Sequence, residues 1–135
     1  MSVTLTDQDK ITLRTAAYGA VSLLAAAGAT GSPHKVATEG SIALASATGL
    51  VGHVLAEKST GMDLSGKTVA ELADRVLPAL AASVNLLRRQ APAEADNFRS
   101  TVLVAVEAAT RAQKGEPSPT MADMTRKITE ALDAA

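Results

Sequence analysis

The chain of 135 residues contains no cysteine and no tryptophan, and its only aromatic side chains are Tyr18 and Phe98. The absence of cysteine excludes disulfides, thiolate-ligated zinc, iron–sulfur clusters and a cysteine nucleophile. The shortage of aromatic rings argues against stacking platforms for single-stranded nucleic acid. The core must therefore be built from Ala, Val and Leu with a few Met side chains.

Strong charge of either sign is also lacking. Thirteen Lys and Arg residues stand against 14 Asp and Glu residues, which gives a net charge of −1. The two signs are interspersed, so no basic face for nucleic acid is expected. The length fits one domain over residues 1–135 that is large enough to bury a core.

Charged residues are missing altogether from two long stretches near the amino end. The first runs from Arg14 to Lys35 and the second from Glu39 to Glu57. Both stretches consist mainly of Ala, Gly, Ser, Leu and Val, which is typical of a helical hairpin that is apolar almost all round. Such helices are buried in a core, in an oligomer or in a membrane.

A membrane hairpin is the less favoured of these readings, although the sequence leaves it open. Each stretch is at the lower limit of length for a bilayer span. Their Ala, Gly, Ser and Thr residues make them weakly hydrophobic, His53 lies in the second, and no aromatic belt flanks them. We expect a cytoplasmic protein without a membrane partner.

Helical periodicity and capping residues predict five helices. Thr6 caps a helix over 7–27, and Ser32 with Pro33 begins a long helix over about 33–58. A third helix opens at Thr68 and contains Pro78, where a kink is expected. The last two helices extend from Pro92 to Gly115 and over about 120–132.

This pattern predicts an all-α, single-domain bundle of about five helices, with the helix over 33–58 at its centre. The helix over 7–27 is then peripheral and exposes an apolar face that includes Ala17, Val21 and Leu24. An apolar face of this kind is typical of an interface, and a homodimer is the commonest arrangement. The alternative is that helix 120–132 or the loop at 59–66 covers it.

Candidate ligand-binding residues gather around the glycines of the second charge-free stretch. Tyr18, Gly49, Gly52 and His53 are predicted to line a small-molecule cavity, because small side chains leave space in an aromatic-poor interior. His53 and Glu57 are four residues apart on one helical face, a spacing that suits two metal ligands. The same pair could also serve as a base and the carboxylate that orients it, which is the enzyme alternative.

The sequence lacks a phosphate-binding glycine loop, a serine nucleophile elbow and a zinc-protease motif. We therefore expect a non-enzymatic, cytoplasmic helical bundle without a cofactor, acting through homo-oligomerisation and contact with a protein partner. The alternative is a small-molecule- or metal-binding bundle with its cavity near Gly49, Gly52 and His53.

Overall fold

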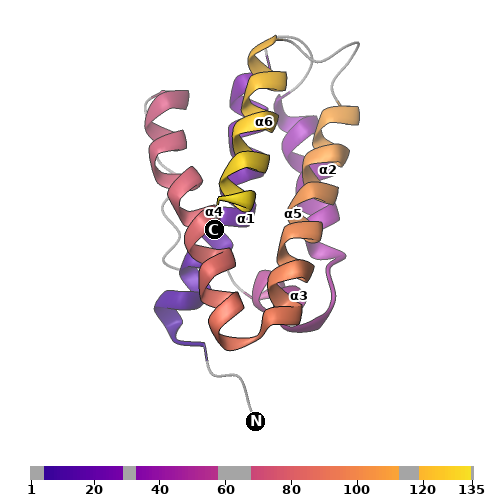
Figure 1. Ribbon diagram of the computed structural model, residues 1–135. Coiled ribbons are helices and arrows are strands. Elements are labelled where there is room, and N and C mark those ends of the chain that lie inside the picture. Colours follow the sequence, from indigo (N-terminus) through magenta and orange to yellow (C-terminus); the bar gives the residue numbers. More distant parts are fainter. Residues whose placement is uncertain (1–4, 29–32, 58–67, 113–118, 135) are drawn as a thin grey trace.

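A computed structural model describes residues 5–28, 33–57, 68–112 and 119–134, with the side chains of Pro33 and His34 left undescribed. The described residues form six helices and no strand (Figure 1). The helices are α1 (Asp7–Ala27), α2 (Pro33–Ala45), α3 (Gly49–Ala56), α4 (Val69–Gln90), α5 (Pro92–Ala112) and α6 (Pro119–Asp133). The all-α class is thus confirmed, with one helix more than expected; Gly115 and the loop at 59–66 lie outside the described residues.

Local hydrogen bonds explain where the helices begin. The hydroxyl of Thr6 accepts the N–H of Asp9 at 3.0 Å, and the Asp9 carboxylate accepts the N–H of Thr6 at 3.0 Å. This reciprocal pair satisfies two donors that an α-helix leaves unpaired at its first turn. Thr68 caps α4 through one bond, in which its hydroxyl accepts the N–H of Glu71 at 3.1 Å. Both starts agree with the sequence-based prediction.

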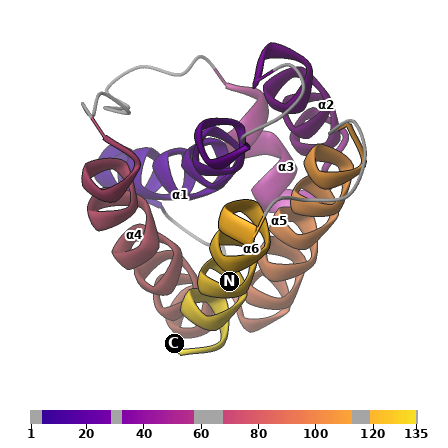
Figure 2. The same ribbon diagram turned by 90° about the horizontal axis from the view of Figure 1, so that it is seen from above.

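The centre of the bundle is formed by α1 and α5, each of which packs against every other helix. In contrast, α2 packs against α1, α3 and α5 only and lies at the edge of the bundle (Figure 2). The prediction of a central helix over 33–58 is therefore matched only roughly. A helix without charged residues belongs at the centre, and α1 meets this description over residues 15–27.

The expected long helix over 33–58 is divided into α2 and α3 by the residues that precede Gly49. Thr48 has an extended backbone, and Gly49 has a φ of 72°. This left-handed conformation is favourable only for a residue without a side chain. The chain therefore changes direction here, and α3 becomes a short separate helix.

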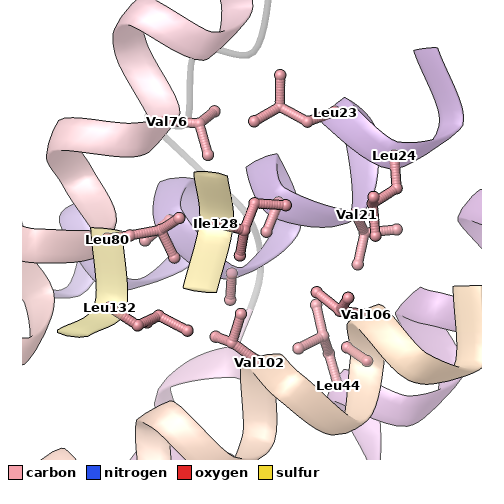
Figure 3. Packing of buried hydrophobic residues seen from close by; sticks show 14 of the residues in the cluster. Val21, Leu23, Leu24, Leu44, Val76, Leu80, Val102, Val106, Ile128 and Leu132 are labelled. Atoms are coloured by element: carbon pink, nitrogen blue, oxygen red, sulfur yellow. The ribbon is translucent and has the colours of Figure 1, made fainter. Parts of the chain in front are cut away.

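The apolar face of α1 is covered by the chain itself (Figure 3). Ala17, Val21 and Leu24, the residues expected at a homodimer interface, are all buried within the chain. The covering helix on this side is α2, which approaches closely because Gly40 has no side chain. A Cβ at position 40 would lie 2.7 Å from Cγ1 of Val21.

The remaining helices bury the stripes that their periodicity predicts. In α4 the buried stripe includes Leu72, Val76, Leu80 and Leu87, while Pro78 is exposed and α4 remains one helix. The buried residues of α6 are Met121, Met124, Ile128 and Leu132. An exposed ion pair of 2.8 Å between Arg99 and Asp133 links α5 to the end of α6.

The length and hydropathy of the helices can be compared with what the hypothesis of a membrane hairpin requires. Across the described ranges, no helix combines the length and the apolar character that a membrane span requires.

Candidate functional site

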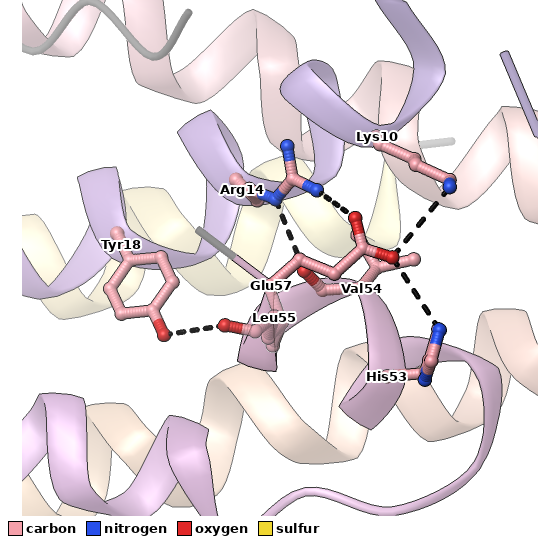
Figure 4. Close-up of polar contacts among 7 residues, drawn as sticks. All are labelled: Lys10, Arg14, Tyr18, His53, Val54, Leu55 and Glu57. Atoms are coloured by element: carbon pink, nitrogen blue, oxygen red, sulfur yellow. Dashed lines mark hydrogen bonds and ion pairs between the residues drawn. The ribbon is translucent and has the colours of Figure 1, made fainter. Parts of the chain in front are cut away.

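Residues of α1 and of α3 with its C-cap Glu57 meet in one polar cluster, which includes Tyr18, His53 and Glu57 from the residues singled out in the sequence (Figure 4). The guanidinium of Arg14 on α1 donates from Nε to the carbonyl of Val54 at 3.1 Å. Nη2 of Arg14 also donates to Oε2 of Glu57 at 2.5 Å. The side chain of Arg14 is only 5% exposed, so this contact is made in a largely desolvated setting where a charged hydrogen bond is strong.

Glu57 is shared by further cationic or potentially cationic groups. Its Oε1 lies 3.6 Å from Nζ of Lys10 and 3.5 Å from Nε2 of His53. The predicted metal pair of His53 and Glu57 is thus brought together. Two permanent positive charges already face the carboxylate, and this disfavours a divalent cation at the same oxygen atoms. Within the described ranges, no group of three or more His, Cys, Asp or Glu side chains is arranged to hold a metal ion.

The same cluster bears on the enzyme alternative. His53 is 77% exposed, whereas Glu57 is engaged by Arg14 and Lys10. A general base needs an orienting partner and a bounded space in which a substrate can be held. The arrangement around Glu57 therefore fits a structural contact better than a catalytic pair.

Tyr18 secures the carboxyl end of α3 beside Arg14. Its hydroxyl donates to the carbonyl of Leu55 at 2.9 Å. Partial burial raises the pKa of the Tyr18 phenol above its usual value of 10.0, while the nearby positive charge of Arg14 acts in the opposite direction. Tyr18 thus acts as a hydrogen-bond donor that remains protonated well into alkaline solution.

The amino end of α3 is capped by residues from another helix. Thr48 makes no side-chain cap, and instead the N–H of Val51 donates to Oε1 of Glu94 at 2.9 Å. Asn97 lies one turn further along α5 and donates to the carbonyl of Thr48 at 2.9 Å. A carboxylate at the amino end of α3 and a guanidinium at its carboxyl end both match the helix dipole.

The cavity predicted near the glycines is not supported by their surroundings. A Cβ at Gly52 would lie 2.2 Å from the carbonyl oxygen of Ala47, so the backbone itself fills that space. Gly49 lies against Glu94 and Asn97, where a Cβ would be 3.1 Å from the carboxylate. Neither glycine therefore borders an open cavity at its Cα, and the side chain of His53 is largely exposed.

A different surface stands out on α2. Among the described residues, the large hydrophobic side chains that are exposed are Ile42, at 56%, and Val104, at 53%. Ile42 projects from the outer face of α2, about one turn before its carboxyl end, beside a shallow hollow between α1 and α2. We call Ile42 and the residues that line this hollow the α2 surface: Tyr18, Ala37, Thr38, Ser41, Ile42 and Ala45.

A second hollow lies on the other flank of α2, toward α5. It is lined by Ala43, Ser46, Ala47, Thr48, Asn97, Ser100, Thr101 and Val104. None of these residues is charged. The carboxyl-terminal part of α2 and the adjoining part of α5 thus form a neutral region, whereas Lys35, Glu39 and Arg111 line a hollow toward the amino end of α2.

The sequence contained a signal for this surface that its interpretation missed. The absence of charge from Gly40 to Ala56 predicts a helix that is buried on all sides. In the structure, Thr38, Ala45 and Ser46 are exposed, and Ile42 lies among them. Small neutral residues tolerate solvent, so the absence of charge marks an uncharged surface here rather than a buried one.

Comparison with protein-family models, with curated proteins and with solved structures gives no match for this chain.

Proposed function

We propose that this chain is a non-enzymatic, cytoplasmic helical bundle that acts through contact with other protein chains, and that the contact is made by the α2 surface. The observation that supports this most directly is Ile42, which exposes 56% of its area on α2 between neutral residues, with Glu39 and Lys35 one and two turns before it. Exposed apolar side chains beside a concave neutral region are typical of protein contact sites.

Binding of a small molecule or a metal is the second candidate and has less support. Gly49 and Gly52 have other atoms of the chain where a Cβ would lie, and His53 is largely exposed. Glu57 is engaged by Arg14 and Lys10. The hollows beside α2 are shallow, whereas a small-molecule site usually encloses most of its ligand.

Photo-cross-linking in living cells tests the proposal. A photoreactive amino acid is placed at Ile42 and, as the matched control, at Ala82, an exposed position on α4. We expect discrete protein adducts from position 42 and none above background from position 82. Adducts of equal yield at both positions, or none at position 42, would contradict the proposed function.

A further inference from the structure

We infer that α3 opens from the bundle as a unit while the other helices stay folded, and that the contact between Arg14 and Glu57 holds it closed. α3 lies at one end of the bundle and packs against α1, α2 and α5 (Figure 1). These three helices also pack directly against one another, and among the described residues α3 makes no helix contact with α4 or α6. Opening of α3 therefore separates no other pair of helices. The inference concerns α3 alone and does not rest on the proposed function.

Both ends of α3 are held by side chains of other helices. At the amino end, Glu94 accepts the N–H of Val51 at 2.9 Å. At the carboxyl end, Arg14 and Tyr18 each donate to a backbone carbonyl of α3, at 3.1 and 2.9 Å. An eight-residue helix is not stable alone in water, so α3 should lose its helical hydrogen bonds when it leaves these partners.

The backbone before α3 permits this movement. Thr48 is extended and Gly49 has a φ of 72°, so neither residue continues the helix of α2. A residue without a side chain changes its backbone conformation at low steric cost. Because α2 ends at Ala45, rotation at these two residues moves α3 without unwinding α2.

The contact that holds α3 closed leaves part of the Arg14 guanidinium unsatisfied. This side chain is only 5% exposed, and a guanidinium has five N–H donors. Within the described ranges, its hydrogen bonds are those from Nε to Val54 and from Nη2 to Glu57 (Figure 4). Burial of a charged group with donors left over costs free energy. Opening of α3 returns these donors to water, which reduces the free-energy difference between the closed and the open form.

Opening exposes apolar side chains that the closed form covers. Val51, Val54 and Leu55 are each at most 2% exposed in the closed form. In the open form they and the parts of α1 and α5 beneath them face solvent. The fold thus contains a conformational device that presents an apolar surface only when α3 opens, in contrast to the permanently exposed Ile42.

Native-state hydrogen exchange separates opening of α3 from unfolding of the whole chain. The amides of Val54 and Leu55 report on α3. The amides of Ala20 and Val102 report on α1 and α5. Ile128→Val weakens the core on α6, a helix that does not contact α3 in the described part of the chain. It should speed exchange at Ala20 and Val102 by about 2- to 12-fold, because these amides exchange through global unfolding.

Exchange at Val54 and Leu55 should be unchanged in Ile128→Val, because the open form keeps every contact of Ile128. An equal rise at both pairs of amides would overturn the inference, since α3 would then open only together with the whole chain. Urea below the unfolding transition gives a second measurement. It should speed exchange in α3 less steeply than exchange in α1 and α5, and equal slopes would also overturn the inference.

Glu57→Gln tests whether the contact with Arg14 holds α3 closed. Loss of the carboxylate charge should speed exchange at Val54 and Leu55 by about fivefold. The matched control is Glu107→Gln, which changes an exposed carboxylate on α5 and should alter this exchange by less than about twofold. Equal effects of the two substitutions would overturn the part assigned to Glu57.

Discussion

The backbone N–H of Val51 donates to Oε1 of Glu94 at 2.9 Å, so a side chain of α5 caps the first turn of α3. The residue that normally caps a helix, here Thr48, makes no such bond. An eight-residue helix is too short to be stable alone in water. The position of α3 therefore depends on α5 as well as on its own buried residues.

Removal of this cap should lower the stability of the bundle. For Glu94→Ala we expect the free energy of unfolding to fall by about 1 kcal/mol, because the Val51 donor and the α3 dipole both lose their partner. Glu94→Gln keeps an acceptor and should lose less. Urea denaturation measures both. The control is Glu107→Ala, an exposed i,i+4 partner of Arg111 on α5, which should change stability by less than about 0.5 kcal/mol.

The opposite end of α3 gives a second prediction. Arg14→Met should lower the free energy of unfolding by about 2 kcal/mol, since a buried donor to Val54 and the main partner of Glu57 are removed together. Glu57→Gln in the same chain should recover part of the loss, because no carboxylate is then left facing an apolar side chain. Equal losses from Arg14→Met and from the exposed control Arg111→Met in chemical denaturation would be inconsistent with this role.

The contact between α1 and α2 gives a prediction of coupling between two positions. Gly40→Ala places a methyl group against Val21 and should destabilise the chain by about 1–3 kcal/mol. In a Val21→Ala background the two nearest atoms are gone and only the Cβ at position 21 remains, at 3.3 Å, so the same substitution should cost clearly less. Thermal and urea unfolding of the four chains give the coupling directly. A Gly40→Ala effect of the same size in both backgrounds would refute the close approach.

Tyr18 predicts how stability changes in alkaline solution. Its pKa is raised in the folded chain above the usual 10.0, so the folded state keeps a proton that the unfolded state has lost. Stability from this group is fully present below pH 10 and is lost as the pH rises through the folded pKa. Tyr18→Phe removes the bond to Leu55 and should be about 1 kcal/mol less stable at pH 8.

The measurement is the free energy of unfolding at pH 8 and at pH 11 for the unmodified chain and for Tyr18→Phe. We expect the difference between the two chains to shrink at the higher pH. The unmodified chain has a phenol that ionises in its unfolded state, and the variant has none. Lysine titration affects both chains equally and cancels in the comparison. A difference that is constant or grows with pH would show that the phenol is not shielded as the structure implies.

The local features of the fold were predictable because each depends on residues close together in the sequence. The capping pair of Thr6 and Asp9 and the buried stripe of α4 are examples. The division of α2 from α3 was harder to see, since the stretch around Gly49 is rich in small residues that also suit a helix interior. Its cap comes from Glu94, which is 43 residues away from Val51, and spacing along the chain carries no trace of that contact.

The candidate site was predicted less well for a related physical reason. The sequence showed which faces lack charge, but two different surfaces share that property. On α1 the uncharged face is covered by other helices, whereas on α2 it is open around Ile42. Which of the two is covered depends on the close contact between Gly40 of α2 and Val21 of α1. Composition does not encode that tertiary contact.

Because α1 lies at the centre of the bundle, its position limits when the core can fold during translation. This helix leaves the ribosome before any of the helices that cover it, and those extend to α6. Until residues near Leu132 have been synthesised, the helices that cover α1 are incomplete. Cooperative assembly of the core must therefore wait for nearly the whole chain, and the emerging α1 is the segment that a chaperone would encounter exposed.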